Sequence, residues 1–221
     1  MTKITSVSAV FDMNRGFFIT FEGPDGCGKS TQIRKLAEYC ESLGYTVKLT
    51  REPGGSAISE KIRQILLDPE NREMCGVAEA LLYAAARAQH VEQTIRPAVE
   101  AGQIVLCDRF MDSSIAYQAY GRGLGDDVRI INEFAVQGMQ PDLTFFLDID
   151  PAKGLARAAS HSKPDRLEQE KLEFHQRVHD GYLALKEIYS SRYVCIDAEQ
   201  SIEDIAQIID ASFDRYVAER A

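Results

Sequence analysis

One segment near the N-terminus combines glycines, a lysine and hydroxyl side chains in a spacing that suits phosphate binding. The run FEGPDGCGKST, at 21–31, contains Gly23, four further residues and then Gly28-Lys29-Ser30. Glycines let the backbone bend so that successive N–H groups converge on one anion, and the positive end of a following helix adds to the attraction. In this phosphate-binding loop (P-loop) pattern the lysine reaches the β- and γ-phosphates of a nucleotide, and the Ser30 hydroxyl contacts Mg²⁺. The residues predicted to bind ATP here are Gly23, Pro24, Asp25, Gly26, Cys27, Gly28, Lys29, Ser30 and Thr31.

Two aspartates that follow apolar runs are candidates for a contact with the metal ion. Asp108 ends the run at 104–107, and Asp148 ends the run at 143–147. We favour Asp108, together with Ser30, for Mg²⁺ or its water shell, because an arginine and a glycine-containing segment follow it directly. Asp148 remains the competing assignment.

Three arginines at separate places in the chain suggest a second anion beside the nucleotide. Arg51 follows a predicted strand, Arg87 lies on a predicted helix, and Arg109 follows Asp108. A P-loop switch protein does not need such a set, whereas a kinase with a phosphorylated acceptor does. Tyr83 lies four residues before Arg87, so the two share one helix face and could form a stacking platform and a hydrogen-bond donor.

The elements that position these residues alternate between strands and helices. Short apolar runs predict strands at 17–21, 45–50, 104–107, 143–147 and 193–196. Helical spacing predicts helices at 29–43, 56–67, 77–95, 126–137, 167–189 and 202–217, with further helices opening at Pro97 and near Pro151. This order predicts an α/β protein with the P-loop NTPase fold, in which a five-stranded parallel sheet carries helices on both faces. Ligands of such sheets bind at the carboxyl ends of the strands.

Composition limits the classes of function. The 221 residues carry a net charge of −9, which argues against a nucleic-acid-coating surface. No apolar run approaches the roughly 18–20 residues of a membrane span. Five scattered cysteines without a CxxC pair indicate reduced thiols and a cytoplasmic location. We expect residues 1–15 to be an N-terminal extension and residues 16–221 to form one domain.

Several segments together resemble the thymidylate kinases of bacteria. They are FEGPDGCGKST, REPGG at 51–55, LYAAARAQH at 82–90, DRFMDSSIAYQ at 108–118 and DRLE at 165–168. The resemblance covers nearly the whole chain from Phe18 onward, and the segment at 108–118 is its most specific part. It implies a nucleoside monophosphate kinase domain that transfers the γ-phosphoryl group of ATP to dTMP with Mg²⁺, for dTTP biosynthesis. It also implies a homodimer.

The resemblance also implies roles for the acceptor residues. Asp25 would contact the sugar 3′-hydroxyl, and Arg51 and Arg109 would bind the dTMP phosphate. Tyr117 would crowd the 2′-position and so disfavour ribonucleotides.

The residues implied at the base come from two segments. Tyr83 would lie against the thymine ring, and Arg87 would donate to its O4, where cytosine presents an amino group instead. Ser114 and Gln118 would line the base pocket.

The transferring phosphoryl group needs cations, which we expect to be Lys29, Arg109 and one residue of a lid. The resemblance implies that the last cation comes either from the P-loop or from a lid. Because the variable loop positions 24–27 contain no basic residue, we expect a short mobile lid at about 157–167 to supply it. Arg166 is the preferred lid cation, Lys163 is an alternative, and Arg157 is expected near the adenine.

Two other functions stay open at this stage. One is a P-loop kinase for a different nucleoside monophosphate. The other is a P-loop nucleotide switch that gates a partner protein. An assay that compares which acceptors stimulate ADP release would distinguish these functions. The sequence does not predict whether dUMP is also accepted as a substrate.

Overall fold

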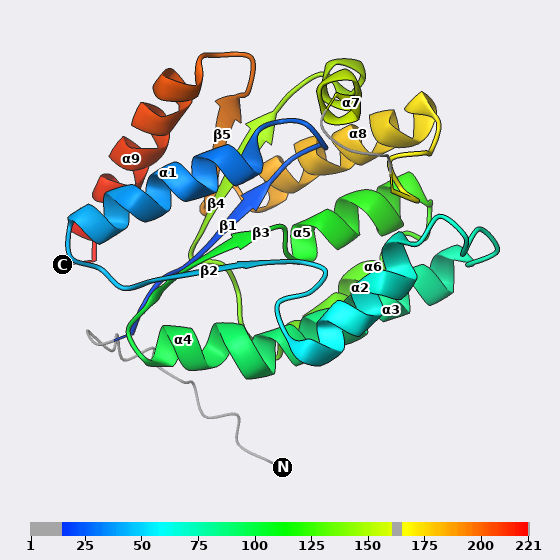
Figure 1. Cartoon of the computed structure of the whole chain (residues 1–221), viewed down its shortest axis with the longest axis horizontal. Helices are drawn as coiled ribbons and strands as arrows, with labels where there is room; N and C mark the ends of the chain where they lie inside the picture. Colours follow the sequence, from blue (N-terminus) through cyan, green and yellow to red (C-terminus); the bar gives the residue numbers. More distant parts are fainter. Residues whose placement is uncertain (1–14, 161–164, 221) are drawn as a thin grey trace, which may run out of the picture.

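The computed structural model describes residues 15–160 and 165–220 of the chain. At its centre five parallel strands form a sheet in the order β2-β3-β1-β4-β5 (Figure 1). The strands are β1 (Phe18–Glu22), β2 (Val47–Arg51), β3 (Ile104–Asp108), β4 (Leu143–Asp148) and β5 (Tyr193–Asp197). The predicted sheet is confirmed, with strand boundaries within one or two residues of those expected.

Helices cover both faces of this sheet (Figure 1). They are α1 (Lys29–Ser42), α2 (Ala57–Leu67), α3 (Gly76–His90), α4 (Arg96–Glu100), α5 (Met111–Ser114), α6 (Asp127–Val136), α7 (Pro151–Ala159), α8 (Leu172–Ile188) and α9 (Ile202–Ala218), with π-helical segments η1 (Val91–Ile95) and η2 (Ile115–Gly121). On the face of α1 and α9, the Phe213 ring packs edge-on against Tyr39 and Tyr45. On the opposite face, the Phe146 ring of β4 stacks on Tyr182 of α8 with centroids 5.3 Å apart.

The sequence does not predict the helical segment formed by α5 and η2. Its serines and its closing glycine have weak intrinsic helix preference. All residues at 111–119 are nevertheless buried, and the segment contacts α6 and α8. Burial against these neighbours therefore decides its conformation.

The expected start of α8 is wrong by five residues. The Asp165 carboxylate accepts hydrogen bonds from the backbone N–H groups of Leu167 and Glu168, at 2.8 and 2.9 Å, and so holds a turn at this point. The helix begins only at Leu172. The long helix expected at 77–95 is present, but its last five residues form η1 and it continues directly into α4.

Helix α8 approaches η2 as closely as it does because two glycines lie at the contact. A Cβ on Gly181 would lie 2.9 Å from Tyr120 Cγ and 3.0 Å from Ala116 Cα. A Cβ on Gly121 would lie 2.8 Å from the Phe174 ring. This contact holds Tyr117 and Gln118 of η2 against the rest of the molecule.

Parts of two predicted segments lie outside the described residues. These are positions 1–14 of the expected N-terminal extension and positions 161–164 of the expected lid, which include Lys163. Within the part of the chain that the structure describes, no helix has both the length and the apolar character to cross a membrane. All five cysteines are free thiols.

Gly181→Ala should lower the free energy of unfolding by about 1–3 kcal/mol, because the added methyl group overpacks the α8–η2 contact. Chemical denaturation monitored by circular dichroism measures this change. Gly76→Ala is the matched control, since a Cβ there meets nothing closer than 3.7 Å. Equal stability of the two variants would contradict the packing argument.

Candidate active site

The P-loop joins the end of β1 to the start of α1 at the carboxyl edge of the sheet. Gly28 precedes α1 with a φ of 97°, in the left-handed region that other residues rarely adopt. The loop also lies directly against α7. A Cβ on Gly154 would be 2.5 Å from the Asp25 carbonyl oxygen, and a Cβ on Gly26 would overlap the Gly154 carbonyl group. Glycine at position 26 is therefore required by this close approach as well as by its φ of 74°.

Lys29 is buried within this loop. Its Nζ donates to the carbonyl oxygens of Gly23 and Pro24, at 3.1 and 3.0 Å, and lies 3.5 Å from Cys27 Sγ. The ammonium group thus lies inside the turn that the sequence pattern assigns to nucleotide phosphates.

The two predicted metal ligands are adjacent. Ser30 Oγ donates to Asp108 Oδ2 at 3.1 Å. Hydroxyl and carboxylate oxygens suit Mg²⁺, which keeps several waters and is commonly held by one or two protein groups together with substrate phosphates. Asp148 lies elsewhere: its Oδ1 is 2.7 Å from His179 Nε2, and it lines a different cavity. The geometry therefore favours Asp108 over Asp148.

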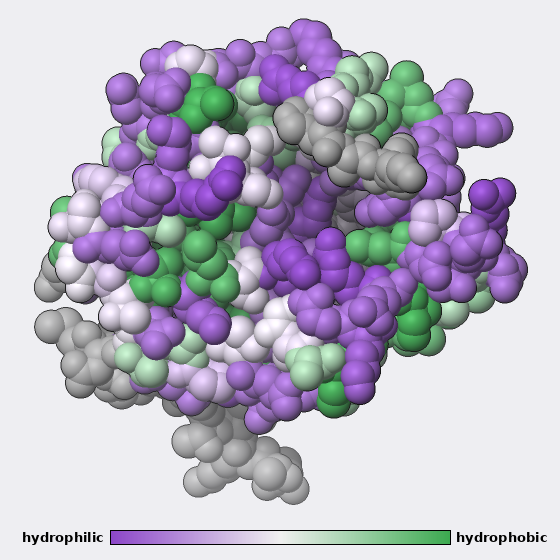
Figure 2. All heavy atoms as spheres, in the orientation of Figure 1, coloured by the Kyte–Doolittle hydropathy of each residue, from purple (hydrophilic) through white to green (hydrophobic). Residues whose placement is uncertain are grey.

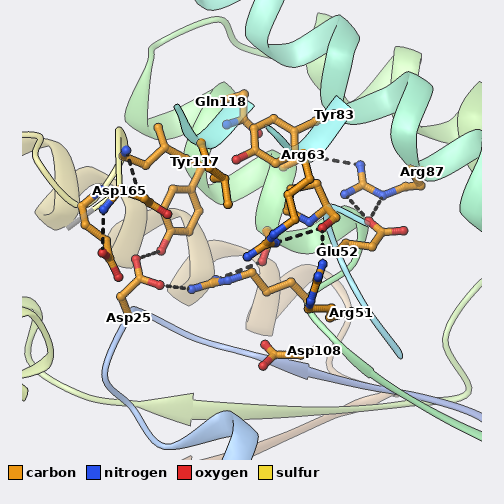
Figure 3. A pocket seen from close by; sticks show the side chains of 17 residues that line it. Asp25, Arg51, Glu52, Arg63, Tyr83, Arg87, Asp108, Tyr117, Gln118 and Asp165 are labelled. Atoms are coloured by element: carbon orange, nitrogen blue, oxygen red, sulfur yellow. Dashed lines mark hydrogen bonds and ion pairs between the residues drawn. The ribbon is translucent and has the colours of Figure 1, made fainter. Parts of the chain in front are cut away.

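Beside the P-loop lies a cavity of about 210 Å³ that is open to solvent. Figure 2 shows hydrophilic residues around a hollow on this face of the molecule. All eight predicted acceptor residues line the cavity: Asp25, Arg51, Tyr83, Arg87, Arg109, Ser114, Tyr117 and Gln118. In Figure 3, Asp108 lies at the strand ends, Tyr83 and Gln118 lie at the opposite end, and Arg51 and Arg63 lie between them.

Arg109 connects the P-loop with this cavity. Its guanidinium forms an ion pair with Asp25 and donates to the Gly23 carbonyl oxygen at 3.0 Å. Tyr117 donates to the other Asp25 oxygen at 2.9 Å, and its ring lies under the Arg109 guanidinium. Burial acts to raise the pKa of Asp25, but the charges of Arg109 and Lys29 outweigh it, so this pKa lies below its usual value. Asp25 is therefore held ionised between the two cations.

Two further arginines face the cavity side by side. Arg51 and Arg63 both donate to the Pro53 carbonyl oxygen, at 2.8 and 2.9 Å, and Arg51 also pairs with Glu60. Burial and the like charge of Arg51 lower the pKa of Arg63. Two guanidinium groups held this close together form a site that an anion would stabilise.

The opposite end of the cavity contains the side-chain amide of Gln118, whose oxygen is available to the cavity. Gln118 Nε2 donates to Glu79 Oε1 at 2.9 Å, which fixes the orientation of the amide. Its Oε1 is then the group directed away from Glu79. Tyr83 lies beside it in Figure 3. This end of the cavity therefore offers an aromatic ring together with a hydrogen-bond acceptor.

Arg87 is 1% exposed, and protein groups contact every nitrogen of its guanidinium. Nε and Nη2 both contact Glu52 Oε2 at 2.7 Å, and Nη2 also donates to the Phe110 carbonyl oxygen at 3.0 Å. Nη1 donates to Ser114 Oγ at 2.9 Å and to Asn132 Oδ1. A guanidinium has five N–H donors; four form hydrogen bonds here, and Nη2 in addition makes an ion-pair contact with the oxygen of Glu52 that already accepts from Nε. A bond from Arg87 to any ligand therefore requires that one of these be released.

Arg166 is not among the residues that line the cavity. Its Nη2 lies 2.6 Å from Glu79 Oε2, and its Nε donates to the Leu66 carbonyl oxygen at 2.8 Å. Arg122 binds the same Glu79 carboxylate. Burial tends to raise the pKa of Glu79, but the hydrogen bonds from Arg122 and Gln118 lower it below its usual value. The structure thus places Arg166 in a buried ion-pair network, apart from the cations of the P-loop and cavity.

The remaining predicted ATP-site residue lies near β5. Arg157, in the last turn of α7, donates to the Ala198 carbonyl oxygen at 3.0 Å. It does not line the acceptor cavity.

Sequence reasoning missed several cavity residues, of which Glu52, Arg63, Ser113, Asp165 and Glu168 carry charge or a hydroxyl. Glu168 belongs to the DRLE segment that supported the resemblance, and this could have identified it. Arg63 follows Glu60 on a predicted helix, where one arginine has no distinctive signal. Only the packing of α2 beside the cavity reveals it.

Comparison with known proteins agrees across sequence and structure. A family model described as thymidylate kinase matches residues 21–209. The thymidylate kinase of Lactobacillus helveticus is 51% identical over 93% of this chain and 99% of its own length. That of Finegoldia magna is 56% identical over 85% of this chain and 93% of its own length.

The crystal structure of thymidylate kinase from Ehrlichia chaffeensis superimposes with a TM-score of 0.75 at 32% identity. It covers 90% of this chain and 99% of its own length. The family model, the relatives and the solved structure agree, and this chain belongs to the thymidylate kinase family.

Proposed function

We propose that this chain phosphorylates dTMP with ATP, with ATP bound in the P-loop and dTMP in the adjoining cavity. The observation that carries this assignment is Arg109, which contacts Gly23 and Asp25 of the P-loop while lining the cavity. A phosphate on an acceptor bound there would face the nucleotide. Phosphoryl transfer requires such positioning together with charge neutralisation. The acceptor phosphate is already an anion, so no general base is required.

The acceptor phosphate binds Arg51 and Arg109, and Arg63 adds a third positive charge. The like charges of Arg51 and Arg63 support this role, because the phosphate would neutralise them. Asp25 accepts a hydrogen bond from the sugar 3′-hydroxyl. Tyr117, which is bonded to Asp25, occupies the space beside the 2′-position and disfavours ribonucleotides.

The base lies between Tyr83 and the polar groups at the far end of the cavity. The Gln118 carbonyl oxygen accepts from the N3–H of thymine, whereas N3 of cytosine has no proton to offer. Arg87 and Ser114 together bind O4. Ser114 Oγ accepts from Arg87, which leaves its own proton available to the base.

Lys29 and the loop N–H groups bind the β- and γ-phosphates, while Ser30 and Asp108 bind Mg²⁺. The metal ion supplies charge neutralisation at the phosphates. Arg157 lies near the adenine, where its bond to Ala198 places it beside the end of β5.

Lys29, Arg109 and Arg166 are the proposed catalytic cations. Lys29 and Arg109 already lie at the junction of the two sites. Arg166 has to leave Glu79 to reach the phosphates, so its contribution depends on a movement of the segment that carries it.

We also propose that residues 16–221 form one nucleoside monophosphate kinase domain, and that the enzyme acts in the cytoplasm in dTTP synthesis. A homodimer is proposed as well. Its support is an exposed apolar face on α3 and on the two helices that contact it, α2 and α6. The residues of this face are Ile58, Ile65, Val77, Leu81, Ile130 and Phe134. Such a face suits burial against a second copy.

The proposed reaction predicts a ranking of acceptors in a coupled ADP-release assay. dTMP should give the highest kcat/KM, and dUMP should be about 10–200-fold lower because it lacks one methyl group. CMP and AMP should be lower by about 100-fold or more, since they mismatch the groups at the base end. Slow ATP hydrolysis that no monophosphate accelerates would instead favour a P-loop switch.

Arg166→Ala should lower kcat by about 100-fold at saturating dTMP and ATP if Arg166 neutralises the transferring group. Arg122→Ala is the matched control, because Arg122 pairs with the same Glu79 carboxylate but lies outside the expected lid. Steady-state kinetics and thermal unfolding should be measured on both variants. If Arg166→Ala keeps kcat within a few-fold of wild type but lowers Tm, Arg166 has no catalytic role and only stabilises the fold through its ion pair with Glu79.

Phe134→Glu should convert the dimer to a monomer, because Phe134 is 87% exposed on the apolar face and a charge there cannot be buried against a second copy. Size-exclusion chromatography with light scattering measures the mass. Ile188→Glu, at an exposed position on α8 outside this face, should leave the mass unchanged. A dimer that survives Phe134→Glu would place the interface elsewhere.

A further inference from the structure

Arg109 has an unusual backbone conformation. Its φ is 68°, and among the described non-glycine residues only Gln137 shares a positive φ. The left-handed region costs an ordinary L-residue roughly 1–2 kcal/mol, so neighbouring contacts must hold Arg109 there.

The side chain of Glu22 supplies those contacts. Glu22 ends β1 and is fully buried. Its Oε1 accepts from the N–H of Phe110, the residue directly after Arg109, at 2.8 Å. Its Oε2 accepts from Ser113 Oγ at 2.6 Å and from Tyr182 Oη at 3.1 Å.

The same two hydroxyl groups also contact the Arg109 guanidinium. Arg109 Nη1 lies 3.2 Å from Ser113 Oγ and 3.1 Å from Tyr182 Oη, as their donor. The two N–H groups of Nη1 are thus shared among these hydroxyls and the Gly23 carbonyl oxygen, while both hydroxyls donate to Glu22 and lie 2.8 Å from each other. The carboxylate is connected to both ends of Arg109, through the following peptide group and through the guanidinium.

We propose that Glu22 is the positioning residue for Arg109, holding its backbone in the left-handed conformation and aiming its guanidinium at the acceptor phosphate. This inference rests on the proposed function, in which Arg109 binds the dTMP phosphate. It needs a carboxylate specifically, because both oxygens of Glu22 accept hydrogen bonds. An amide offers one oxygen and one NH₂ group, so it would lose the bond on one side in either orientation.

The buried carboxylate of Glu22 is not explained by a contribution to the free energy of folding. Burial, followed by the charge of Asp112, raises the pKa of Glu22 to about 7, although Ser113, Arg109 and the Phe110 N–H act in the opposite direction. Asp112 itself is paired with Arg192 and Tyr193. A carboxyl group whose pKa is raised on folding favours the folded state most below its ordinary value and loses that contribution as the pH rises through 7. At pH 8, the ionised Glu22 is therefore a cost to stability.

Glu22→Gln should raise KM for dTMP by about tenfold or more at pH 8 and leave KM for ATP within about twofold. Its Tm should equal or exceed that of wild type. Asp112→Asn is the matched control, because it removes a neighbouring buried carboxylate that does not contact Arg109. It should lower Tm through Arg192 and leave KM for dTMP unchanged.

A double-mutant cycle separates positioning from a general disturbance. In a Ser113→Ala/Tyr182→Phe background the hydroxyl link is already broken, so Glu22→Gln should raise KM for dTMP by a clearly smaller factor than in wild type. Tyr182→Phe alone deletes one hydroxyl and keeps the carboxylate, so it should raise KM for dTMP even if Glu22→Gln does not fold.

Two results would contradict the positioning role of Glu22. One is a folded Glu22→Gln enzyme whose KM for dTMP is unchanged. The other is a cycle in which Glu22→Gln raises KM for dTMP by the same factor in the Ser113→Ala/Tyr182→Phe background as in wild type. With Glu22→Gln unfolded, an unchanged KM in Tyr182→Phe would overturn the role. These outcomes differ from a failure of the proposed function, which would show as a wild-type enzyme that does not turn over dTMP.

Discussion

The ion pair between Arg109 and Asp25 is the interaction on which the rest of the site depends. Asp25 belongs to the P-loop and Arg109 to the end of β3, so the pair joins the two strands that are adjacent at the centre of the sheet. A buried cation without a partner would be unfavourable, and the carboxylate compensates for its lost hydration. In the proposed reaction, the same contact would hold the acceptor phosphate against the nucleotide loop. The alignment of the two substrates would then follow from the parallel pairing of β1 with β3.

Around this pair, most buried polar groups belong to networks of hydrogen bonds and ion pairs. Arg87 donates four hydrogen bonds and pairs with Glu52, while the Glu79 carboxylate contacts Gln118, Arg122 and Arg166, whose buried Nη2 has no hydrogen-bond partner among the described residues. Partly satisfied groups of this kind would be costly, whereas fully satisfied ones restrict the side chains to one arrangement. If dTMP binds as proposed, the end of the cavity that receives the base is therefore largely formed beforehand, and its selectivity would rest on the direction of each donor and acceptor.

Prediction from the sequence succeeded where a signal is local. The P-loop spacing and the apolar strands each depend on neighbouring residues, and each is found in the structure. It failed where distant contacts decide. The helical segment at 111–121 forms because α6 and α8 bury it, and Leu167 lies in a turn because Asp165 binds its backbone. Arg63 has no distinctive spacing, and only the packing of α2 beside the cavity reveals it. Glu22 lies in the run FEGPDGCGKST, but its partners come from the residues after β3 and from α8.

The amino-acid sequence by itself determined the parallel α/β architecture and the family, because these follow from hydrophobic periodicity and motif spacing. It also predicted eight acceptor residues, and these line one cavity in the structure. The tertiary structure alone decided how those residues are paired. Arg166 illustrates the difference: its position suggested a catalytic cation, yet it contacts Glu79, a residue 87 positions away in the chain. Burial of a charge demands a partner, and which partner is available depends on the folding of distant segments onto one another.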